Sequence, residues 1–213
     1  MTEIAATIAK DLLSIEAVTL RPNEPFTWAS GIHSPIYTDN RLTISYPQVR
    51  RDIANGIAAI IREQYPTTAV IAGVATAGIP HAAWVAELLD LPLIYVRSKP
   101  KDHGAGRQIE GVLKPGQKVV MLDDLISTGG SVLQAAKAVQ AAGGDILAVG
   151  SVFSYQLAAA TTNFAAAKLP LFSLSNYSTL IEVARQADYI NDADLASLHA
   201  WRQNPATWGQ QHR

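Results

Sequence analysis

The sequence predicts an α/β fold in which a central, mostly parallel sheet is flanked by helices. Short apolar runs alternate along the chain with segments whose apolar residues recur at helical spacing. Such alternation is typical of parallel strands joined by right-handed helical crossovers, with helices on both faces of the sheet. Small or polar loops follow three of the apolar runs, and in this fold class ligands bind at the carboxyl ends of the strands.

The first part of the chain predicts a helix, a hairpin and a second helix. Apolar residues at helical spacing predict the first helix over residues 3–16. Residues 26–39 predict a hairpin that is interrupted at Gly31 and at Ser34-Pro35. Pro47 is expected to begin the next helix, because proline fits the first helical turn.

The rest of the chain predicts the sheet and its helices. The expected strands are residues 69–73, 93–96, 118–122, 146–153 and a short final run at 171–174. The expected helices are residues 79–89, about 131–142, 154–167, 178–187 and 192–203.

The composition indicates one globular domain. The 213 residues are enough for a large core, and 48% of them are hydrophobic and 16% charged. A formal net charge of −1 gives no support to nucleic-acid or membrane binding. The chain has no cysteine, no long apolar run and no signal-peptide pattern, so we expect a cytoplasmic protein without disulfides or thiolate metal sites.

The stretch from Val119 to Ser131 predicts a binding site for a phosphorylated sugar. An apolar run suited to a buried strand ends in Asp123 and Asp124, and a loop of hydroxyl residues and glycines then leads into a helix. Glycine lets the loop backbone turn tightly, and the N-terminal end of a helix favours an anion such as phosphate. Carboxylates repel phosphate, so the two aspartates are expected to face ribose hydroxyls or a metal ion.

Commoner phosphate loops have other patterns. A Walker loop ends in Gly-Lys-Ser or Gly-Lys-Thr, and a Rossmann fingerprint places its acid on the following strand. The simplest alternative is a strand that ends in a hydrophilic turn, with both aspartates solvated. A turn alone does not require two acids followed by five small residues, so the pattern favours a binding site.

A long polar loop from Arg97 to Gly111 carries several cations. Arg97, Lys99, Lys101 and Arg107, together with His103, could neutralise a polyanion in a nearby pocket. A loop of this length in a compact domain is usually a lid or a disordered segment. By itself it would be interpreted as a solvated excursion, but beside a phosphate loop we favour anion binding.

These stretches together carry a family resemblance. The sequence Asp123-Asp124-Leu-Ile-Ser-Thr-Gly-Gly-Ser131 resembles the motif with which type I phosphoribosyltransferases bind PRPP, 5-phosphoribosyl 1-diphosphate. Within that family, the stretch from Lys101 to Gly104 resembles the mobile catalytic loop of the branch that uses orotate. Ser30–Tyr37 resembles the hairpin of that branch near the pyrimidine, and Trp201–Gly209 resembles the ending of its bacterial members. The resemblance covers almost the whole chain.

The resemblance implies the type I phosphoribosyltransferase fold in a single domain of residues 1–213. A small N-terminal hood of about residues 1–45, with part of the C-terminal region, would cover a PRPP-binding core of about residues 46–175. The implied reaction converts PRPP and orotate to orotidine 5′-monophosphate and diphosphate, a step of UMP biosynthesis, with Mg²⁺ held mainly by PRPP oxygens. In relatives the mobile loop reaches into the neighbouring subunit, which implies a homodimer with shared active sites.

The implied roles follow the charges of the reaction, in which the ribose becomes positive and the leaving diphosphate negative. Asp123 and Asp124 would hold the ribose hydroxyls beside the developing cation, and Lys101 would stabilise the diphosphate. The remaining implied contacts are Arg97, His103, Thr76 and Ala77 for the diphosphate, Leu125, Ile126, Ser127, Thr128, Gly129, Gly130 and Ser131 for the 5′-phosphate, and Ser127, Ser30, Gly31 and Tyr37 for orotate.

The chain departs from some orotate enzymes at four positions. Ala29, Ala77 and Ser98 stand where some of them carry lysine, and Tyr155 stands where some carry arginine. The orotate carboxylate is therefore expected to rest on backbone N–H groups near Ser30 and Gly31.

Two alternatives remain open. The first is a phosphoribosyltransferase for another base, which the hairpin and the lysine loop argue against. The second is a non-catalytic regulator of the same fold that binds nucleotide or RNA, which the net charge and the intact acid pair argue against.

Overall fold

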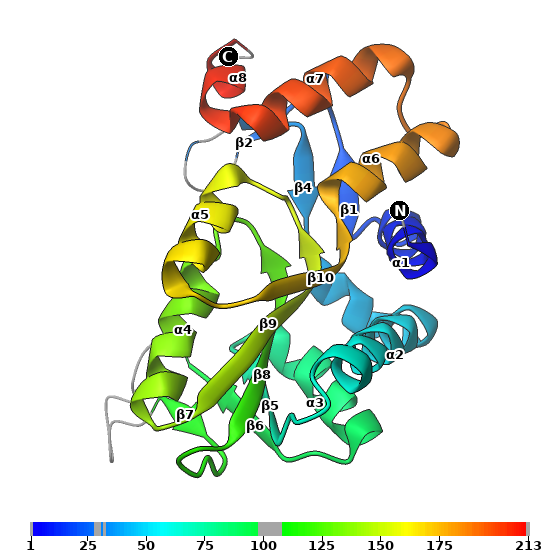
Figure 1. Ribbon diagram of the computed structural model, residues 1–213. Coiled ribbons are helices and arrows are strands. Elements are labelled where there is room, and N and C mark those ends of the chain that lie inside the picture. Colours follow the sequence, from blue (N-terminus) through cyan, green and yellow to red (C-terminus); the bar gives the residue numbers. More distant parts are fainter. Residues whose placement is uncertain (1, 28–30, 32, 98–107, 212–213) are drawn as a thin grey trace.

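The computed structural model describes residues 2–27, 31, 33–97 and 108–211, and a six-stranded sheet lies at its centre (Figure 1). The strands lie in the order β10-β9-β8-β5-β6-β7, and every neighbouring pair is parallel except β6 with β7. They are β5 (Val70–Val74), β6 (Leu93–Val96), β7 (Ile109–Glu110), β8 (Lys118–Ile126), β9 (Asp145–Ser154) and β10 (Leu171–Asn176). The predicted α/β class with a mostly parallel sheet is confirmed.

Helices cover both faces of this sheet (Figure 1). Alternate residues of β8 point to opposite faces, so Val120 and Leu122 join one core and Val119 and Met121 the other. The first core includes residues of α1 (Glu3–Ser14), α2 (Pro47–Gln64) and α3 (Gly78–Leu89), and the second includes residues of α4 (Gly130–Ala141) and α5 (Ala158–Ala167). Burial on both faces explains why the strands are continuous apolar runs in the sequence.

Two small antiparallel sheets and the C-terminal helices lie together at one end of the molecule (Figure 1). Their elements are β1 (Val18–Leu20), β2 (Phe26–Thr27), β3 (His33–Ser34), β4 (Ile36–Thr38), α6 (Tyr177–Gln186), α7 (Asp192–Gln203) and α8 (Pro205–Gln211). The 3₁₀ helix η1 (Asn40–Ser45) follows β4 and contacts α2 and β8. The helix α8 packs on β3, where a side chain on Gly209 would lie 3.3 Å from Cβ of His33. Within the described residues, no helix has the length and apolar character needed to span a membrane.

The expected hairpin over residues 26–39 is divided between the two small sheets. Phe26–Thr27 pairs with His33–Ser34, whereas Ile36–Thr38 pairs with Val18–Leu20, a strand that was not expected. Pro35 has no backbone N–H and therefore interrupts the ladder. The Oγ of Ser34 donates to the carbonyl of Ile36 at 2.9 Å, which stabilises the break.

Other boundaries also differ from the sequence-based expectation. The strand β8 continues four residues past Leu122, because Leu125 and Ile126 pair with Phe153 and Ser154 of β9. The helix α5 begins at Ala158 rather than at residue 154, because β9 runs to Ser154 and Gln156 has a positive φ of 55°. The short elements β7 and α8 were not expected.

His81 gives the fold a dependence on pH. It is fully buried on α3 against Trp84, with ring centroids 5.8 Å apart, and burial lowers its pKa from 6.5 to about 4. Between these values the unfolded chain binds the proton and the folded chain does not, so the free energy of unfolding falls as the pH drops from 6.5 towards 4. Replacing His81 by leucine is expected to reduce that fall, as measured by urea unfolding across this pH range.

The matched control is His199→Leu, on an exposed position of α7. It should leave the pH dependence of unfolding unchanged. A His81→Leu protein that loses stability on acidification as steeply as the parent would show that other groups carry the effect.

Candidate functional site

Asp123 and Asp124 lie near the carboxyl end of β8. Asp123 is 7% exposed, and its Oδ1 accepts a hydrogen bond of 2.9 Å from the backbone N–H of Asp124. Burial raises the pKa of both carboxyls, and the charge of Asp124 raises the pKa of Asp123 further. A buried carboxyl and a half-buried one this close together retain a shared proton more readily than they carry two negative charges. The pair is therefore suited to hydroxyl donors or to a cation.

The loop after β5 lies directly against the strand that carries the acid pair. A Cβ on Gly78 would overlap the carbonyl oxygen of Leu122 and lie 3.1 Å from Cα of Asp123. Only glycine allows this approach. Thr76, which is exposed, and Ala77 precede Gly78, and the Ala75–Thr76 peptide bond is cis. Thr76 and Ala77 therefore lead into the close contact of Gly78 with the strand that carries the acid pair, and their assignment to the diphosphate stays a prediction.

The loop from Ser127 to Ser131 joins β8 to α4. Gly129 is the N-cap of α4 with a φ of 79°, and it makes no side-chain hydrogen bond to the first turn. The N–H groups at this helix end are thus without a side-chain cap, which suits an anion. Thr128, Gly130 and Ser131 are exposed and Ser127 is half-buried, so the loop offers hydroxyls as well as backbone donors.

The α5 helix holds this loop in place from one side. The Nδ2 of Asn163 donates to the carbonyl of Thr128 at 2.9 Å. A Cβ on Gly129 would lie 2.5 Å from the ring of Phe164, whereas a Cβ on Gly130 would meet only Oγ1 of Thr128, at 3.8 Å.

Replacing Gly129 by alanine is therefore expected to destabilise the protein by about 1–3 kcal/mol, through the positive φ and the overlap with Phe164. Alanine at Gly130 should leave the free energy of unfolding within about 0.5 kcal/mol of the parent value. Urea unfolding of the two variants tests this contrast. Equal losses at both positions would contradict the assigned packing.

The two ends of the cationic loop are fastened together. The backbone N–H of Arg97 donates to the carbonyl of Gln108 at 2.9 Å, and Nε2 of Gln108 donates to the carbonyl of Arg97 at 3.2 Å. The guanidinium of Arg97 also lies 3.8 Å from the carboxylate of Glu110. Lys101 and His103 lie outside the described residues, so their assignment stays a prediction.

The other predicted site residues are placed as follows. Leu125 and Ile126 belong to β8, and their side chains pack into the cores. Tyr37, on β4, is 46% exposed and its ring lies 5.6 Å from that of Phe26. Gly31 is exposed with a φ of 81°. Ser30 is not among the described residues.

Tyr155, which stands where some orotate enzymes carry arginine, is not charged. Its side chain is buried, with its ring in edge contact with Phe153 and Trp201. Burial raises the pKa of Tyr155 to about 12, so the phenol is neutral at physiological pH.

Sequence reasoning missed two residues beside the acid pair. The Nδ2 of Asn40 donates to the carbonyl of Asp124 at 2.7 Å. The guanidinium of Arg41 donates two hydrogen bonds to the carboxylate of Asp39, at 2.6 and 3.0 Å, and its charge opposes the rise in the pKa of Asp124 that burial causes. The only signal in the sequence was the polar triplet Asp39-Asn40-Arg41 at the end of the expected hairpin.

No cluster of three or more His, Asp or Glu side chains that could hold a metal occurs in the described part of the chain. The acid pair supplies two carboxyl groups. A pair of this kind suits a Mg²⁺ ion that takes its other ligands from substrate and water.

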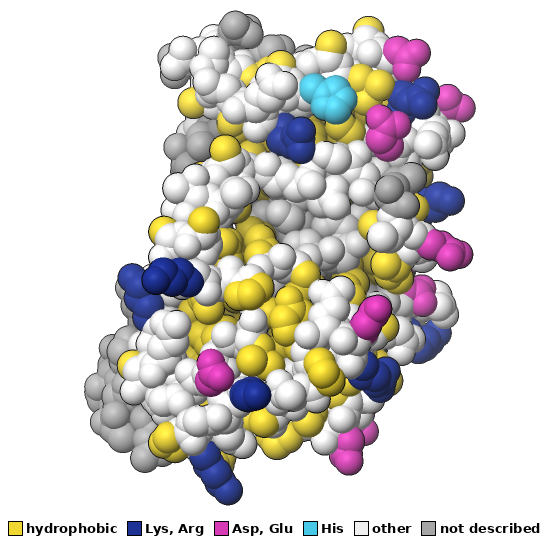
Figure 2. Space-filling model, in the orientation of Figure 1, with side chains coloured by type: hydrophobic (Ala, Val, Ile, Leu, Met, Phe, Trp, Pro, Cys, Tyr) yellow, Lys and Arg dark blue, Asp and Glu magenta, His cyan; other side chains and the backbone are white. Residues whose placement is uncertain are grey.

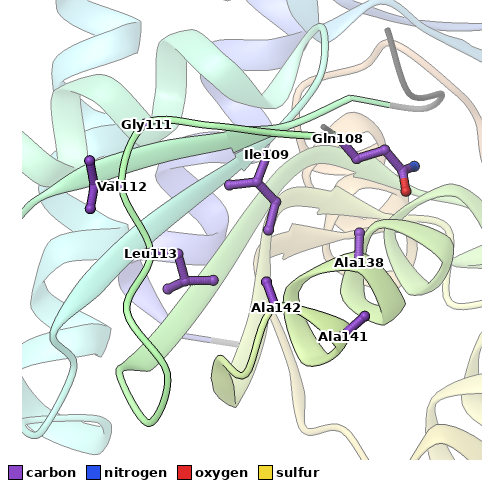
Figure 3. Close-up of a pocket in the computed structure, with 8 residues that line it drawn as sticks. All are labelled: Gln108, Ile109, Gly111, Val112, Leu113, Ala138, Ala141 and Ala142. Atoms are coloured by element: carbon purple, nitrogen blue, oxygen red, sulfur yellow. The ribbon is translucent and has the colours of Figure 1, made fainter. Parts of the chain in front are cut away.

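On the face drawn in Figure 2, cationic and anionic side chains are interspersed. A hollow of about 590 Å³ lies between α4 and the segment that contains β7 (Figure 3). It is lined by Gln108, Ile109, Gly111, Val112, Leu113, Ala138, Ala141 and Ala142. Apart from the amide of Gln108 these side chains are apolar or absent, so the lining has no charge for a phosphate.

Residues 45–169 match the family model described as the phosphoribosyl transferase domain. Together with an acid pair on β8, a glycine loop and an uncapped helix N-terminus, this match defines the class as phosphoribosyltransferase. The chain is 84% identical over 209 residues to a protein of Lactiplantibacillus plantarum named orotate phosphoribosyltransferase, covering 98% of this chain and 99% of that one. It is 59% identical over 198 residues to the protein of the same name in Bacillus subtilis, covering 93% and 92%.

A solved structure gives the same result. The orotate phosphoribosyltransferase of Aeropyrum pernix superposes with a TM-score of 0.73 at 25% identity, over 86% of this chain and 99% of that one. The chain belongs to the orotate phosphoribosyltransferase family. The resemblance noted in the sequence and the type I phosphoribosyltransferase fold are thus confirmed.

Proposed function

We propose that this chain transfers the 5-phosphoribosyl group of PRPP to orotate, giving orotidine 5′-monophosphate and diphosphate. The observation that supports this most directly is the placement of the buried Asp123 and the half-buried Asp124 on β8, a few residues before the uncapped N-terminus of α4. One end of a phosphorylated ribose needs an anion site, and its hydroxyls need acceptors. The loop at Gly129 supplies the first, and Asp123 and Asp124 supply the second.

The chemistry of the transfer explains the charge distribution around the site. As the bond from C1′ to the diphosphate breaks, positive charge develops on the ribose and negative charge on the leaving group. Asp123 and Asp124 stabilise the ribosyl cation, and Lys101 with Arg97 and His103 stabilises the diphosphate. The backbone at Thr76 and Ala77 adds contacts to the diphosphate, and Ser127 of the phosphate loop also contacts orotate.

The base site is proposed at the small sheets. Ser30, Gly31 and Tyr37 would contact orotate there, with the orotate carboxylate on backbone N–H groups near Gly31. This division makes residues 1–45 and part of the C-terminal region a hood over a PRPP-binding core of about residues 46–175. The packing of α8 on β3 supports a structural link between the two ends of the chain.

Mg²⁺ is proposed as the cofactor, since it would neutralise diphosphate and ribose oxygens when bound. The acid pair fits this ion, and most of its ligands would come from PRPP. A homodimer with shared active sites and a cytoplasmic location are proposed as well, the first from the resemblance and the second from the lack of cysteine.

Orotate-dependent release of diphosphate from PRPP, with and without Mg²⁺, tests the proposal. Orotate, uracil, adenine and hypoxanthine in one competition assay separate this function from that of a phosphoribosyltransferase for another base. The expected result is that diphosphate is released with orotate and with none of the other three bases. Binding of RNA in a gel shift without any turnover would favour a regulatory protein instead.

A further inference from the structure

Asn40 connects the small sheets to the acid pair. It is fully buried at the start of η1, two residues after the end of β4, the strand that carries Tyr37. Its Nδ2 donates to the carbonyl oxygen of Asp124 at 2.7 Å, across 84 positions of the sequence. The Oγ1 of Thr43 donates to the carbonyl of Asn40 at 2.5 Å and fixes the turn from the other side.

Packing alone does not explain an asparagine at this position. The Oδ1 of Asn40 is buried and accepts no hydrogen bond from a described residue. A buried polar atom without a partner lowers stability, and an apolar side chain of similar size would avoid that loss. Among the described residues, the hydrogen bond that this side chain makes goes to the residue proposed to hold the ribose.

The neighbours of Asn40 extend this connection. Asp39 holds the guanidinium of Arg41, and the charge of Arg41 acts on Asp124. The first residues after β4 therefore influence both the position and the charge of Asp124, while β4 itself lies at the proposed base site.

We propose that Asn40 is a positioning residue of the transfer reaction, which holds Asp124, and through it the ribose, at a fixed distance from the base. The inference rests on the proposed function. The base nitrogen must approach C1′ in line with the leaving diphosphate, and a displacement of about 1 Å from that geometry can cost a hundredfold in rate. The hydrogen bond from Asn40 joins the two halves of the site whose separation sets this geometry.

The test compares Asn40→Ala with Ser175→Ala. Ser175 is also fully buried, and its Oγ donates to the carbonyl of Ala5 at 2.8 Å, between β10 and α1. Both variants lose a buried hydrogen bond to a backbone carbonyl, so both should lose some stability. Only Asn40→Ala should lower kcat/KM for PRPP, by at least about tenfold.

The preference between two ligands is a measurement that a loss of folding stability does not affect. Ribose 5-phosphate and inorganic phosphate share the phosphate group and differ in the ribose hydroxyls. Asn40→Ala is expected to reduce the preference for ribose 5-phosphate over phosphate, and Ser175→Ala to retain it. In addition, the double variant Asn40→Ala with Asp124→Asn should have a kcat/KM for PRPP only slightly lower than that of Asp124→Asn alone.

The outcomes separate the two proposals. A parent protein that releases no diphosphate from PRPP with orotate overturns the proposed function. An active parent whose Asn40→Ala variant keeps both the kcat/KM and the ligand preference, or whose double variant shows additive losses, overturns the positioning role alone.

Discussion

Replacing Asp123 by asparagine is expected to lower the rate of transfer from PRPP by at least about a hundredfold and to raise the free energy of unfolding at neutral pH. The rate falls because an amide, unlike the carboxyl of Asp123, cannot ionise as positive charge develops on the ribose. Stability rises because asparagine is neutral without a proton, whereas the folded parent must keep Asp123 protonated above the ordinary pKa of that group. The Oδ1 of asparagine can still accept the hydrogen bond from the N–H of Asp124, so the local backbone should persist.

The gain in stability should depend on pH in a defined direction. Above 3.8 the unfolded chain loses the proton of Asp123 while the folded chain keeps it, so the parent becomes less stable as the pH rises from that value. Asparagine has no such loss, and the advantage of the variant should increase with pH. Urea unfolding at several pH values and a diphosphate-release assay measure the two effects.

Asp145→Asn is the control, since Asp145 is exposed at the opposite end of the sheet, where β9 begins. It should change neither quantity. An Asp123→Asn protein that is active, or that is less stable than the parent at neutral pH, is incompatible with the role assigned to the acid pair.

Lys101→Ala is expected to lower kcat by at least about a hundredfold while the protein stays folded. The ammonium group is proposed to stabilise the negative charge that develops on the diphosphate, so its loss should act mainly on the chemical step. Steady-state kinetics with PRPP and orotate, with circular dichroism to check folding, measure this effect.

Lys118→Ala supplies the comparison. Lys118 is an exposed lysine at the start of β8, at the opposite end of that strand from the acid pair. Its removal should leave kcat unchanged. Near-normal turnover of Lys101→Ala would refute the leaving-group role.

The sheet could be predicted because its signal is local. Strands such as β5 and β9 are buried on both faces, so each is a nearly continuous apolar run. The small sheets could not be predicted in the same way. The partner of β4 is β1, which is three residues long and precedes the β2–β3 pair in the sequence, whereas β4 follows that pair. No periodicity can emerge over so short a strand.

The same distinction between local and distant signals applies to the residues of the site. Asp123, Asp124 and Gly129 are close in sequence, so their pattern alone predicted a phosphorylated sugar. Asn40 contacts Asp124 only because the chain folds back over 84 positions, and the polar triplet at Asn40 does not indicate which residue it would contact. Position in the fold, rather than residue type, identifies such a residue.

The antiparallel pairing of β7 with β6 also has a consequence for solubility. Without β7, the outer side of β6 would present unpaired backbone groups, the kind of strand edge at which proteins aggregate. The chain returns along this edge at Ile109, near the end of the cationic loop. A shortened variant made to study the loop should therefore retain Arg97 and residues 108–110, because a deletion that includes β7 would leave the edge of the sheet open to other copies of the protein.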